Sequence, residues 1–259
     1  MNLRQVADKT LASNTVIAAT SGILAQAGGV PRKGRRSGLR NEQPMADVIP
    51  YCTADDPRDL IHRAVQNLTS GQILGLPLET GYVAAAHGVA PDAVTRLSEF
   101  SEQLVLMPRF AEDAVDFLPG ISRMARKLVM RSWPGPVILQ FAGTSATGGL
   151  GEGLPDAVRG RLGDPLNMRV SGASIAAEIT RYVPGPLVIS REFSSAETLQ
   201  AELASQDVLI IENGKPQFPA GVTSVSVDND TWSVTHEGVI STGNVQRMAN
   251  EVLVFVCTG

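Results

Sequence analysis

Glycine is concentrated in residues 142–153, which read AGTSATGGLGEG. A loop of this kind can do phosphate chemistry, because glycine lets consecutive backbone amides turn toward a phosphate group. The segment lacks the Gly-Lys-Ser/Thr ending of a Walker loop. We therefore predict a flexible insertion here rather than a phosphate cradle.

Metal and thiol chemistry have few candidate residues. The histidines, His62, His87 and His236, are scattered, and the two cysteines, Cys52 and Cys257, stand far apart. None of these spacings is typical of a zinc site, so the sequence predicts no metal ligands. Two cysteines in 259 residues argue against a disulfide framework and favour a reducing compartment, the cytoplasm.

A basic segment near the N-terminus is a candidate for binding an anionic partner and not for catalysis. Residues 28–44 read GGVPRKGRRSGLRNEQP, a composition that cannot bury an apolar face. We predict that residues 1–44 are a flexible basic extension, and Met45 is an alternative start. The cations there could bind RNA phosphates, or they could form a solvated tail.

Overall composition excludes some classes of function. A net charge of −4 gives no general attraction to nucleic acid or to anionic membranes. No apolar run reaches the roughly 18–20 residues that cross a bilayer, so we expect no membrane partner. Residues 16–27 resemble a secretory signal only faintly, because polar residues such as Asn14 and Ser21 dilute the apolar stretch.

The elements that would position a site follow an alternating pattern. Asp56-Pro57 is a typical helix start, and apolar residues then repeat at helical spacing until Ser70-Gly71. Further helices are predicted over residues 91–100, 111–129 with a break at 119–120, 173–181 and 196–204. Apolar runs predict strands over residues 72–78, 104–107, 137–141, 167–170, 187–190, 208–212, 224–228 and 232–235. Residues 83–86 fit either a strand or a helix. The alternation predicts an α/β or α+β domain with a mixed sheet.

Several segments, in order along the chain, resemble the motifs of one family. They are residues 71–82 (GQILGLPLETGY), 133–139 (WPGPVIL), 168–170 (MRV) with 185–190 (GPLVIS), 224–228 (SVSVD) and 236–240 (HEGVI). These resemble the P-T-[ED]-T-x-Y, W-P-G-P, R-x-P with S-A-N, S-T-V-V-D and R-x-G motifs of the YrdC-like, or threonylcarbamoyl-AMP synthase, family. The resemblance covers roughly residues 55–242, and we assign residues 45–242 to a YrdC-like domain.

This resemblance implies a twisted mixed sheet with flanking helices, whose open face holds a nucleotide. It implies the synthesis of threonylcarbamoyl-AMP from L-threonine, bicarbonate and ATP with Mg²⁺, a step in tRNA modification, and it implies double-stranded RNA as a further partner. The positions that match the family, and so are expected to bind the nucleotide or substrate, are Thr80, Tyr82, Arg169, Ser190 and Ser224.

The chain differs from the resembled family at positions where that family carries positively charged side chains. Adenylyl transfer requires fixed cations around a triphosphate. Ser101 and Gln103 stand where the family has a Lys-x-Arg pair, and Glu102 lies between them. Glu192 replaces the asparagine of S-A-N, and His236 replaces an arginine, for which a neutral imidazole is a poor substitute. No residue is therefore assigned a catalytic role.

The last nine residues, 251–259 (EVLVFVCTG), resemble the first strand of a low-molecular-weight protein tyrosine phosphatase. The Cys-x5-Arg loop of that family is not complete here, so Cys257 is predicted to be inert in phosphoryl transfer. Residues 241–250 would then be a connector that could form a short helix carrying Val245 and Met248, and we assign residues 243–259 to a connector and truncated first strand. The alternative is a plain terminal strand with a buried cysteine.

Three hypotheses about function remain open. The domain binds a nucleotide or double-stranded RNA without turnover, it is an active synthase that uses ATP and Mg²⁺ with substitute charges, or it is the regulatory half of a split phosphatase fusion. The missing lysine and arginine favour a binding domain over an enzyme.

Overall fold

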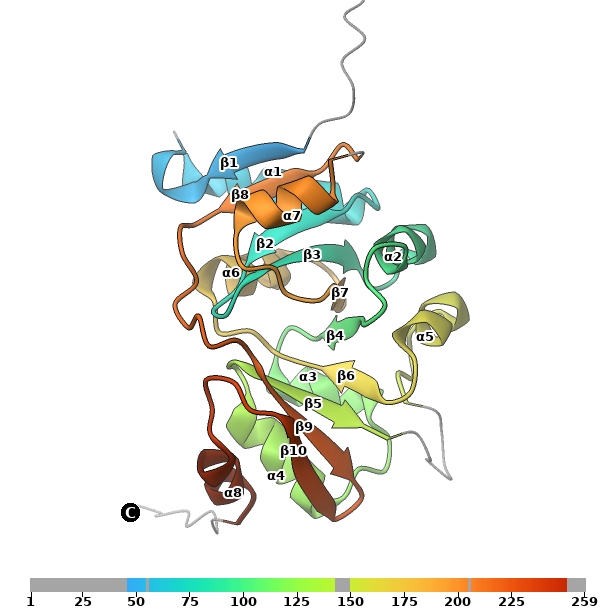
Figure 1. Ribbon diagram of the computed structural model, residues 1–259. Coiled ribbons are helices and arrows are strands. Elements are labelled where there is room, and N and C mark those ends of the chain that lie inside the picture. Colours follow the sequence, from blue (N-terminus) through green and yellow to red (C-terminus); the bar gives the residue numbers. More distant parts are fainter. Residues whose placement is uncertain (1–45, 55, 143–149, 205, 251–259) are drawn as a thin grey trace, which may run out of the picture. The chain divides into compact units, whose positions relative to one another are not determined.

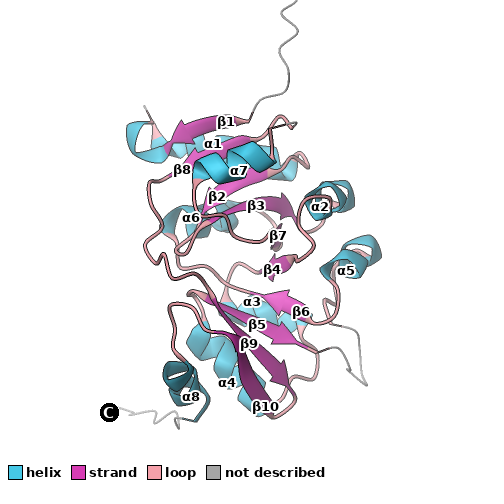
Figure 2. Ribbon diagram, viewed as in Figure 1, coloured by secondary structure: helices cyan, strands magenta, loops and turns pink. Residues whose placement is uncertain are grey.

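The computed structural model describes residues 46–54, 56–142, 150–204 and 206–250, which lie within one compact unit. The predictions for residues 1–44, for most of the glycine-rich loop and for residues 251–259 lie outside this part. Within it, a ten-stranded sheet is flanked by helices on both faces (Figures 1 and 2). No helix here is long and apolar enough to span a bilayer.

The sheet is mixed, as predicted. Its strand order is β1-β8-β2-β3-β7-β4-β6-β5-β9-β10. The pairs β1–β8, β8–β2, β4–β6 and β5–β9 are parallel, and the other neighbours are antiparallel. The bounds are β1 Asp47–Pro50, β2 Leu74–Pro77, β3 Tyr82–His87, β4 Val105–Met107, β5 Val137–Phe141, β6 Leu166–Met168, β7 Leu187–Ile189, β8 Leu209–Glu212, β9 Thr223–Asp228 and β10 Thr231–His236.

Helix boundaries follow local chemistry. The first helix begins after Asp56, whose carboxylate accepts the Arg58 N–H at 2.8 Å. The predicted helix over residues 111–129 is broken at Gly120, whose φ is 74°. The bounds are α1 Pro57–Thr69, α2 Pro91–Ser98, α3 Ala111–Ala114, α4 Arg123–Ser132, α5 Asp156–Leu162, α6 Ser174–Tyr182, α7 Ala196–Glu202 and α8 Thr242–Asn250, with 3-10 turns η1 Tyr51–Thr53 and η2 Val115–Phe117. Strand β1, helix α5 and the 3-10 turn η1 have no counterpart among the predicted elements.

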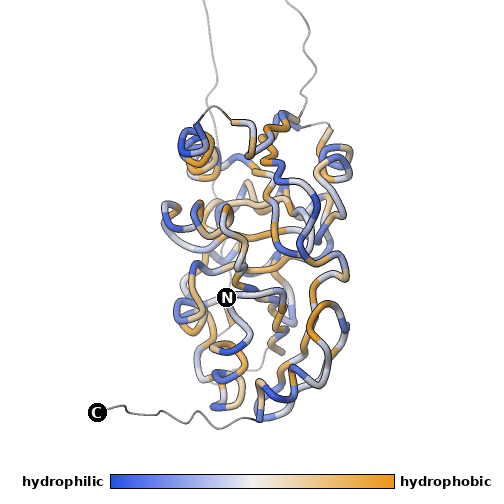
Figure 3. The backbone as a smooth tube through the Cα atoms, turned by 90° about the vertical axis from the view of Figure 1, so that its left-hand side faces the viewer, coloured by the Kyte–Doolittle hydropathy of each residue, from blue (hydrophilic) through white to orange (hydrophobic). Residues whose placement is uncertain are grey.

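Two hydrophobic clusters lie on opposite faces of the sheet. Strand β3 shows the division, because Val83 and Ala85 join one cluster and Ala84 and Ala86 join the other. The helices α1 and α6 cover the first face, and α2, α4, α5, α7 and α8 contribute to the second. The tube coloured by hydropathy shows apolar stretches along the strands and mixed colouring along the helices (Figure 3), as amphipathic helices require.

The region predicted as a connector is helix α8, and it shares the core of this domain. Val245 and Ala249 are buried in the cluster that includes α4. Arg131 of α4 donates to the backbone carbonyl of Met248 at 3.1 Å. The packing of α8 therefore helps to close one face of the sheet near β5 and β9.

The opposite face of β5 and β9 carries more polar residues. Along β5, Val137, Leu139 and Phe141 are buried against helices, whereas Ile138 and Gln140 are only partly buried. Along β9, Val225 and Val227 alternate in the same way with partly buried serines. This alternation of period two leaves polar side chains on the face that also carries α1 and α6.

We predict that Gly81→Ala destabilises the fold. A Cβ at Gly81 would lie 2.7 Å from the Phe193 carbonyl oxygen and 3.2 Å from the Glu192 Cβ. Such overpacking costs about 1–3 kcal/mol. Gly160→Ala is the matched control: it lies inside α5 with open space around it, and alanine should stabilise the helix by about 0.5–1 kcal/mol. Urea unfolding checks both, and a Gly81→Ala protein as stable as the wild type would contradict the prediction.

Candidate functional site

The candidate site is built around Arg169, which follows β6 and has no exposed side-chain surface. Its Nη2 donates to Glu79 Oε2 at 2.7 Å, and its Nη1 donates to Glu192 Oε1. Glu79 lies in the loop between β2 and β3, and Glu192 lies in the loop between β7 and α7. We call Arg169, Glu79, Glu192 and Thr80 the arginine cluster.

Hydroxyl and amide groups complete the arginine cluster. Thr80 Oγ1 accepts from Arg169 Nη2 at 3.2 Å and donates to Glu192 Oε1. Ser171 Oγ donates to Glu79 Oε2 at 2.7 Å, and the Gly172 N–H donates to Glu79 Oε1. Three loops that are far apart in the sequence are therefore joined through one guanidinium.

The charges of the arginine cluster do not balance. One guanidinium and two carboxylates leave a net charge of −1. Opposite charges about 4 Å apart attract by roughly 4 kcal/mol at an effective dielectric constant of 20, so the pairing of Arg169 is strong. Its Nε is buried and has no hydrogen-bond partner among the described residues. The two terminal nitrogens of Arg169 are thus committed to internal carboxylates, and its Nε–H is the donor that has no partner within the described residues.

A cavity of about 320 Å³ opens beside the arginine cluster. Its apolar side is formed by Val105, Ile138 and Ile189, which lie on three different strands of the sheet. The polar side chains that line it come from β5, β9 and β10 and from the loops before β4, after β6 and after β7: Gln103, Gln140, Arg169, Ser190, Arg191, Glu192, Ser224, Thr235 and His236. Small-molecule sites combine apolar surface with polar groups that orient the ligand, and the lining of this cavity is richer in polar side chains than most.

Three of the five predicted site residues line this cavity. They are Arg169, Ser190 and Ser224. The Ser190 hydroxyl accepts from the Ala84 N–H at 3.0 Å and donates to the Arg191 carbonyl at 2.8 Å. The Ser224 side chain makes no hydrogen bond within the described residues, so it has capacity for a ligand. Thr80 is connected to the cavity through the arginine cluster.

Ser101, which was expected to stand where the resembled family has a lysine, has a structural role. Ser101 is 2% exposed, accepts the Arg191 N–H at 3.0 Å and donates to the Gln103 carbonyl at 2.8 Å. It therefore anchors the loop after β7, whereas the Gln103 and His236 side chains line the cavity.

The remaining cation of the cavity is Arg191, and it also has internal contacts. Its guanidinium lies 4.2 Å from the centre of the Phe193 ring and 3.6 Å from Glu202. Half of its side chain is exposed, so this ion pair is weak.

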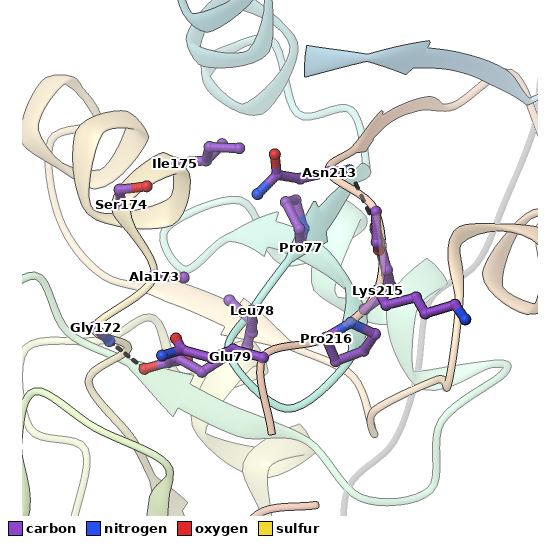
Figure 4. A pocket seen from close by; sticks show the side chains of 13 residues that line it. Pro77, Leu78, Glu79, Gly172, Ala173, Ser174, Ile175, Asn213, Lys215 and Pro216 are labelled. Atoms are coloured by element: carbon purple, nitrogen blue, oxygen red, sulfur yellow. Dashed lines mark hydrogen bonds between the residues drawn. The ribbon is translucent and has the colours of Figure 1, made fainter. Parts of the chain in front are cut away.

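Tyr82 lies at a second, smaller cavity. This cavity has a volume of about 270 Å³ and is lined by residues 77–79, 172–175 and 213–217 together with Tyr82. Figure 4 shows Glu79 between Gly172 and Pro216, with Lys215 extending away from it. Glu79 borders this cavity and Arg169 borders the larger one, so the arginine cluster contributes to both.

The hydroxyl of Tyr82 is used structurally. It donates to the Gly214 carbonyl at 2.5 Å and accepts the Asn213 N–H at 3.0 Å. Burial raises the pKa of Tyr82 above its ordinary value of 10.0; the Asn213 N–H opposes this shift, and the charges of Glu212 and Glu197 add to it. Tyr82 therefore holds the loop after β8 in place and does not line the larger cavity.

Some site residues were not predicted from sequence. The role of Glu79 was not assigned although it fits the family motif, and Glu192 was noted only as a missing asparagine. Gln140 and Thr235 gave no signal beyond their place on alternating strands. Among the described residues, no group of His, Cys, Asp or Glu is arranged to hold a metal ion.

Comparisons with solved structures identify the architecture. Sua5 of P. abyssi, in a variant form, superposes with a TM-score of 0.67 at 18% identity, covering 80% of this chain and 61% of that chain. P. abyssi Sua5 complexed with L-threonine superposes with a TM-score of 0.64 at 17% identity, covering 80% of this chain and 62% of that chain. E. coli YciO superposes with a TM-score of 0.60 at 21% identity, covering 75% of this chain and 96% of that chain. The chain spans about three fifths of the length of the Sua5 chains.

No family model and no curated protein matches the sequence. The fold is that of an α/β domain with a mixed sheet, and a cavity of about 320 Å³ lies beside its arginine cluster. Within that class, the chain has the YrdC-like fold that Sua5 and YciO share, at low sequence identity.

Replacing Arg169 by methionine should strongly destabilise the protein. The change leaves Glu79 and Glu192 without their cation, and removing one partner of a buried ion pair costs about 3–5 kcal/mol. Arg63→Met is the control, since the Arg63–Asp47 pair is about half exposed and is worth about 0–1 kcal/mol. Urea unfolding gives both values. A loss below that of the control would show that Arg169 does not hold the loops together.

The raised pKa of Tyr82 predicts that the protein loses stability at alkaline pH. As the pH rises above about 10, this tyrosine ionises in the unfolded state before it does so in the folded state, so stability falls. Tyr82→Phe should remove part of that fall. Tyr182→Phe, at a side chain that is 54% exposed, should keep the wild-type profile. Unfolding followed between neutral and alkaline pH tests this, and identical slopes for the wild type and Tyr82→Phe would contradict it.

Proposed function

We propose that this domain binds the nucleoside part of a nucleotide in the 320 Å³ cavity beside the arginine cluster. The observation that carries the proposal is the convergence of Arg169, Ser190 and Ser224 on this cavity. A place in the cytoplasm and in tRNA modification belongs to the same proposal and rests on the likeness to the YrdC-like family.

The shape and chemistry of the cavity support a nucleoside. The apolar side formed by Val105, Ile138 and Ile189 suits a planar base, which gains from contact with apolar surface. The polar border offers the hydroxyl of Ser224 and the amide of Gln103, which suit a ribose or the edge of a base.

Adenylyl transfer fits the cavity less well. A triphosphate with Mg²⁺ needs free cations and oxygen ligands, whereas Arg169 is paired with two carboxylates and Ser101 is buried in a structural role. The residues present therefore do not fit a Mg²⁺–triphosphate group. We accordingly propose a binding domain rather than an active threonylcarbamoyl-AMP synthase.

Two other hypotheses involve segments of the chain that do not line the cavity. Double-stranded RNA binding would draw on the basic residues before residue 45, and a phosphatase fusion would draw on residues 251–259. Both segments lie outside the described residues. RNA binding is checked by the affinity for duplex RNA at increasing salt, because phosphate contacts make affinity fall steeply with salt.

Calorimetry with AMP tests the proposed function. We expect binding by the wild-type protein and a loss of about 2–10-fold for Ser224→Ala, the effect of one hydrogen bond. Ser226→Ala, two residues along β9 and not among the lining residues, is the control. Absence of binding to AMP, ATP and adenosine alike would refute the proposal.

Turnover is measured separately, as pyrophosphate release from ATP with L-threonine and bicarbonate. L-threonine is the ligand of one similar solved structure, P. abyssi Sua5. We expect no release from folded protein. Release that requires both L-threonine and bicarbonate would support the active synthase instead.

A further inference from the structure

Glu192 brings a carboxylate to the wall of the cavity. Its Oε1 accepts from Arg169 Nη1 and from Thr80 Oγ1, so the side chain is fixed from two sides. It is 18% exposed, in contrast to Arg169 with no exposed surface, and it is among the residues that line the cavity. The carboxylate rather than the guanidinium is therefore the more accessible charge at this end.

The effect of this arrangement is an end of the cavity at which the accessible charge is the negative one of Glu192. Glu79, which borders the smaller cavity, and Glu192 together exceed the formal charge of Arg169 by one unit, so Arg169 adds no net positive charge here. The other arginine that lines the cavity, Arg191, has a half-exposed side chain whose guanidinium lies 4.2 Å from the centre of the Phe193 ring and 3.6 Å from Glu202. A polyphosphate placed here would face a carboxylate in a partly buried setting, where like charges repel strongly.

We infer that Glu192 is a specificity-determining residue that makes the cavity bind nucleosides in preference to nucleoside triphosphates. The inference rests on the proposed function, and it names the form of the ligand. The base and ribose occupy the apolar and hydroxyl-bearing part of the cavity. Each added phosphate lowers the affinity, because Arg169 is neutralised by Glu192 and cannot offer its charge to an anion.

Calorimetry on the full chain with adenosine, AMP and ATP, each with and without Mg²⁺, measures this preference directly. For the wild type we expect affinity to fall in the order adenosine, AMP, ATP, with ATP at least about tenfold weaker than adenosine. ATP binding as tightly as adenosine, or more tightly, would overturn the inference.

Glu192→Gln identifies the residue responsible. Glutamine keeps the shape and an acceptor oxygen for Arg169 and Thr80, so the loop contacts persist while one negative charge is removed. We expect ATP affinity to rise about tenfold and adenosine affinity to stay within about threefold. Glu178→Gln makes the same charge change on α6, at a residue that does not line this cavity, and should leave the ATP-to-adenosine ratio unchanged.

A second variant keeps the inference testable if Glu192→Gln fails to fold. Glu192→Asn places at this position the residue type that the resembled family carries, and it should shift the ratio in the same direction. Unchanged ratios in both folded variants would overturn the role of Glu192 while leaving nucleoside binding intact. Failure of all three ligands to bind any protein would instead refute the proposed function, so the two failures are distinguishable.

Discussion

The buried guanidinium of Arg169 is the interaction on which the site depends. A charged group without solvent exposure must be paired inside the protein, because its desolvation otherwise costs several kcal/mol. Arg169 is paired with Glu79 and Glu192, from the loops after β2 and β7. The pairing therefore ties these loops to the segment after β6 that carries Arg169. The same pairing shapes the borders of both cavities.

The position of the larger cavity follows from the alternation of side chains on β5 and β9. The residues of these strands that pack against α4 and α8 are apolar and buried, while those on the other face are partly exposed. Loops held by the arginine cluster lie beside this more polar face. The cavity is thus formed by a secondary-structure pattern on one side and by an ion-pair cluster on the other. The lining of this cavity therefore includes residues of the sheet and residues of the loops.

Sequence patterns predicted the elements well and the site only in part. Apolar repeats and helix caps such as Asp56 are local signals, and they located most helices and strands of the described chain. Strand β1 and helix α5 were not predicted, since their short segments carry little periodic signal. The arginine cluster joins residues as far apart as Glu79 and Glu192. No local pattern encodes such a contact, so Glu192 was noted only for what it replaces. Tyr82 shows the converse case, because its motif position implied a ligand while its hydroxyl binds the loop after β8.

A family motif specifies residue types, but the availability of their charge depends on the neighbours. Arg169 matches the resembled motif and lies at the cavity, yet its hydrogen-bonding atoms Nη1 and Nη2 are directed to internal carboxylates. A guanidinium in that state stabilises loops and gives little attraction to an anion, since its charge is cancelled at short range. Glu192, at a position where the resembled family is expected to carry asparagine, thus makes more than one contact, because its carboxylate also offsets the charge of Arg169. In this domain the formal charge of the arginine cluster is a property of its four residues together, and it is negative.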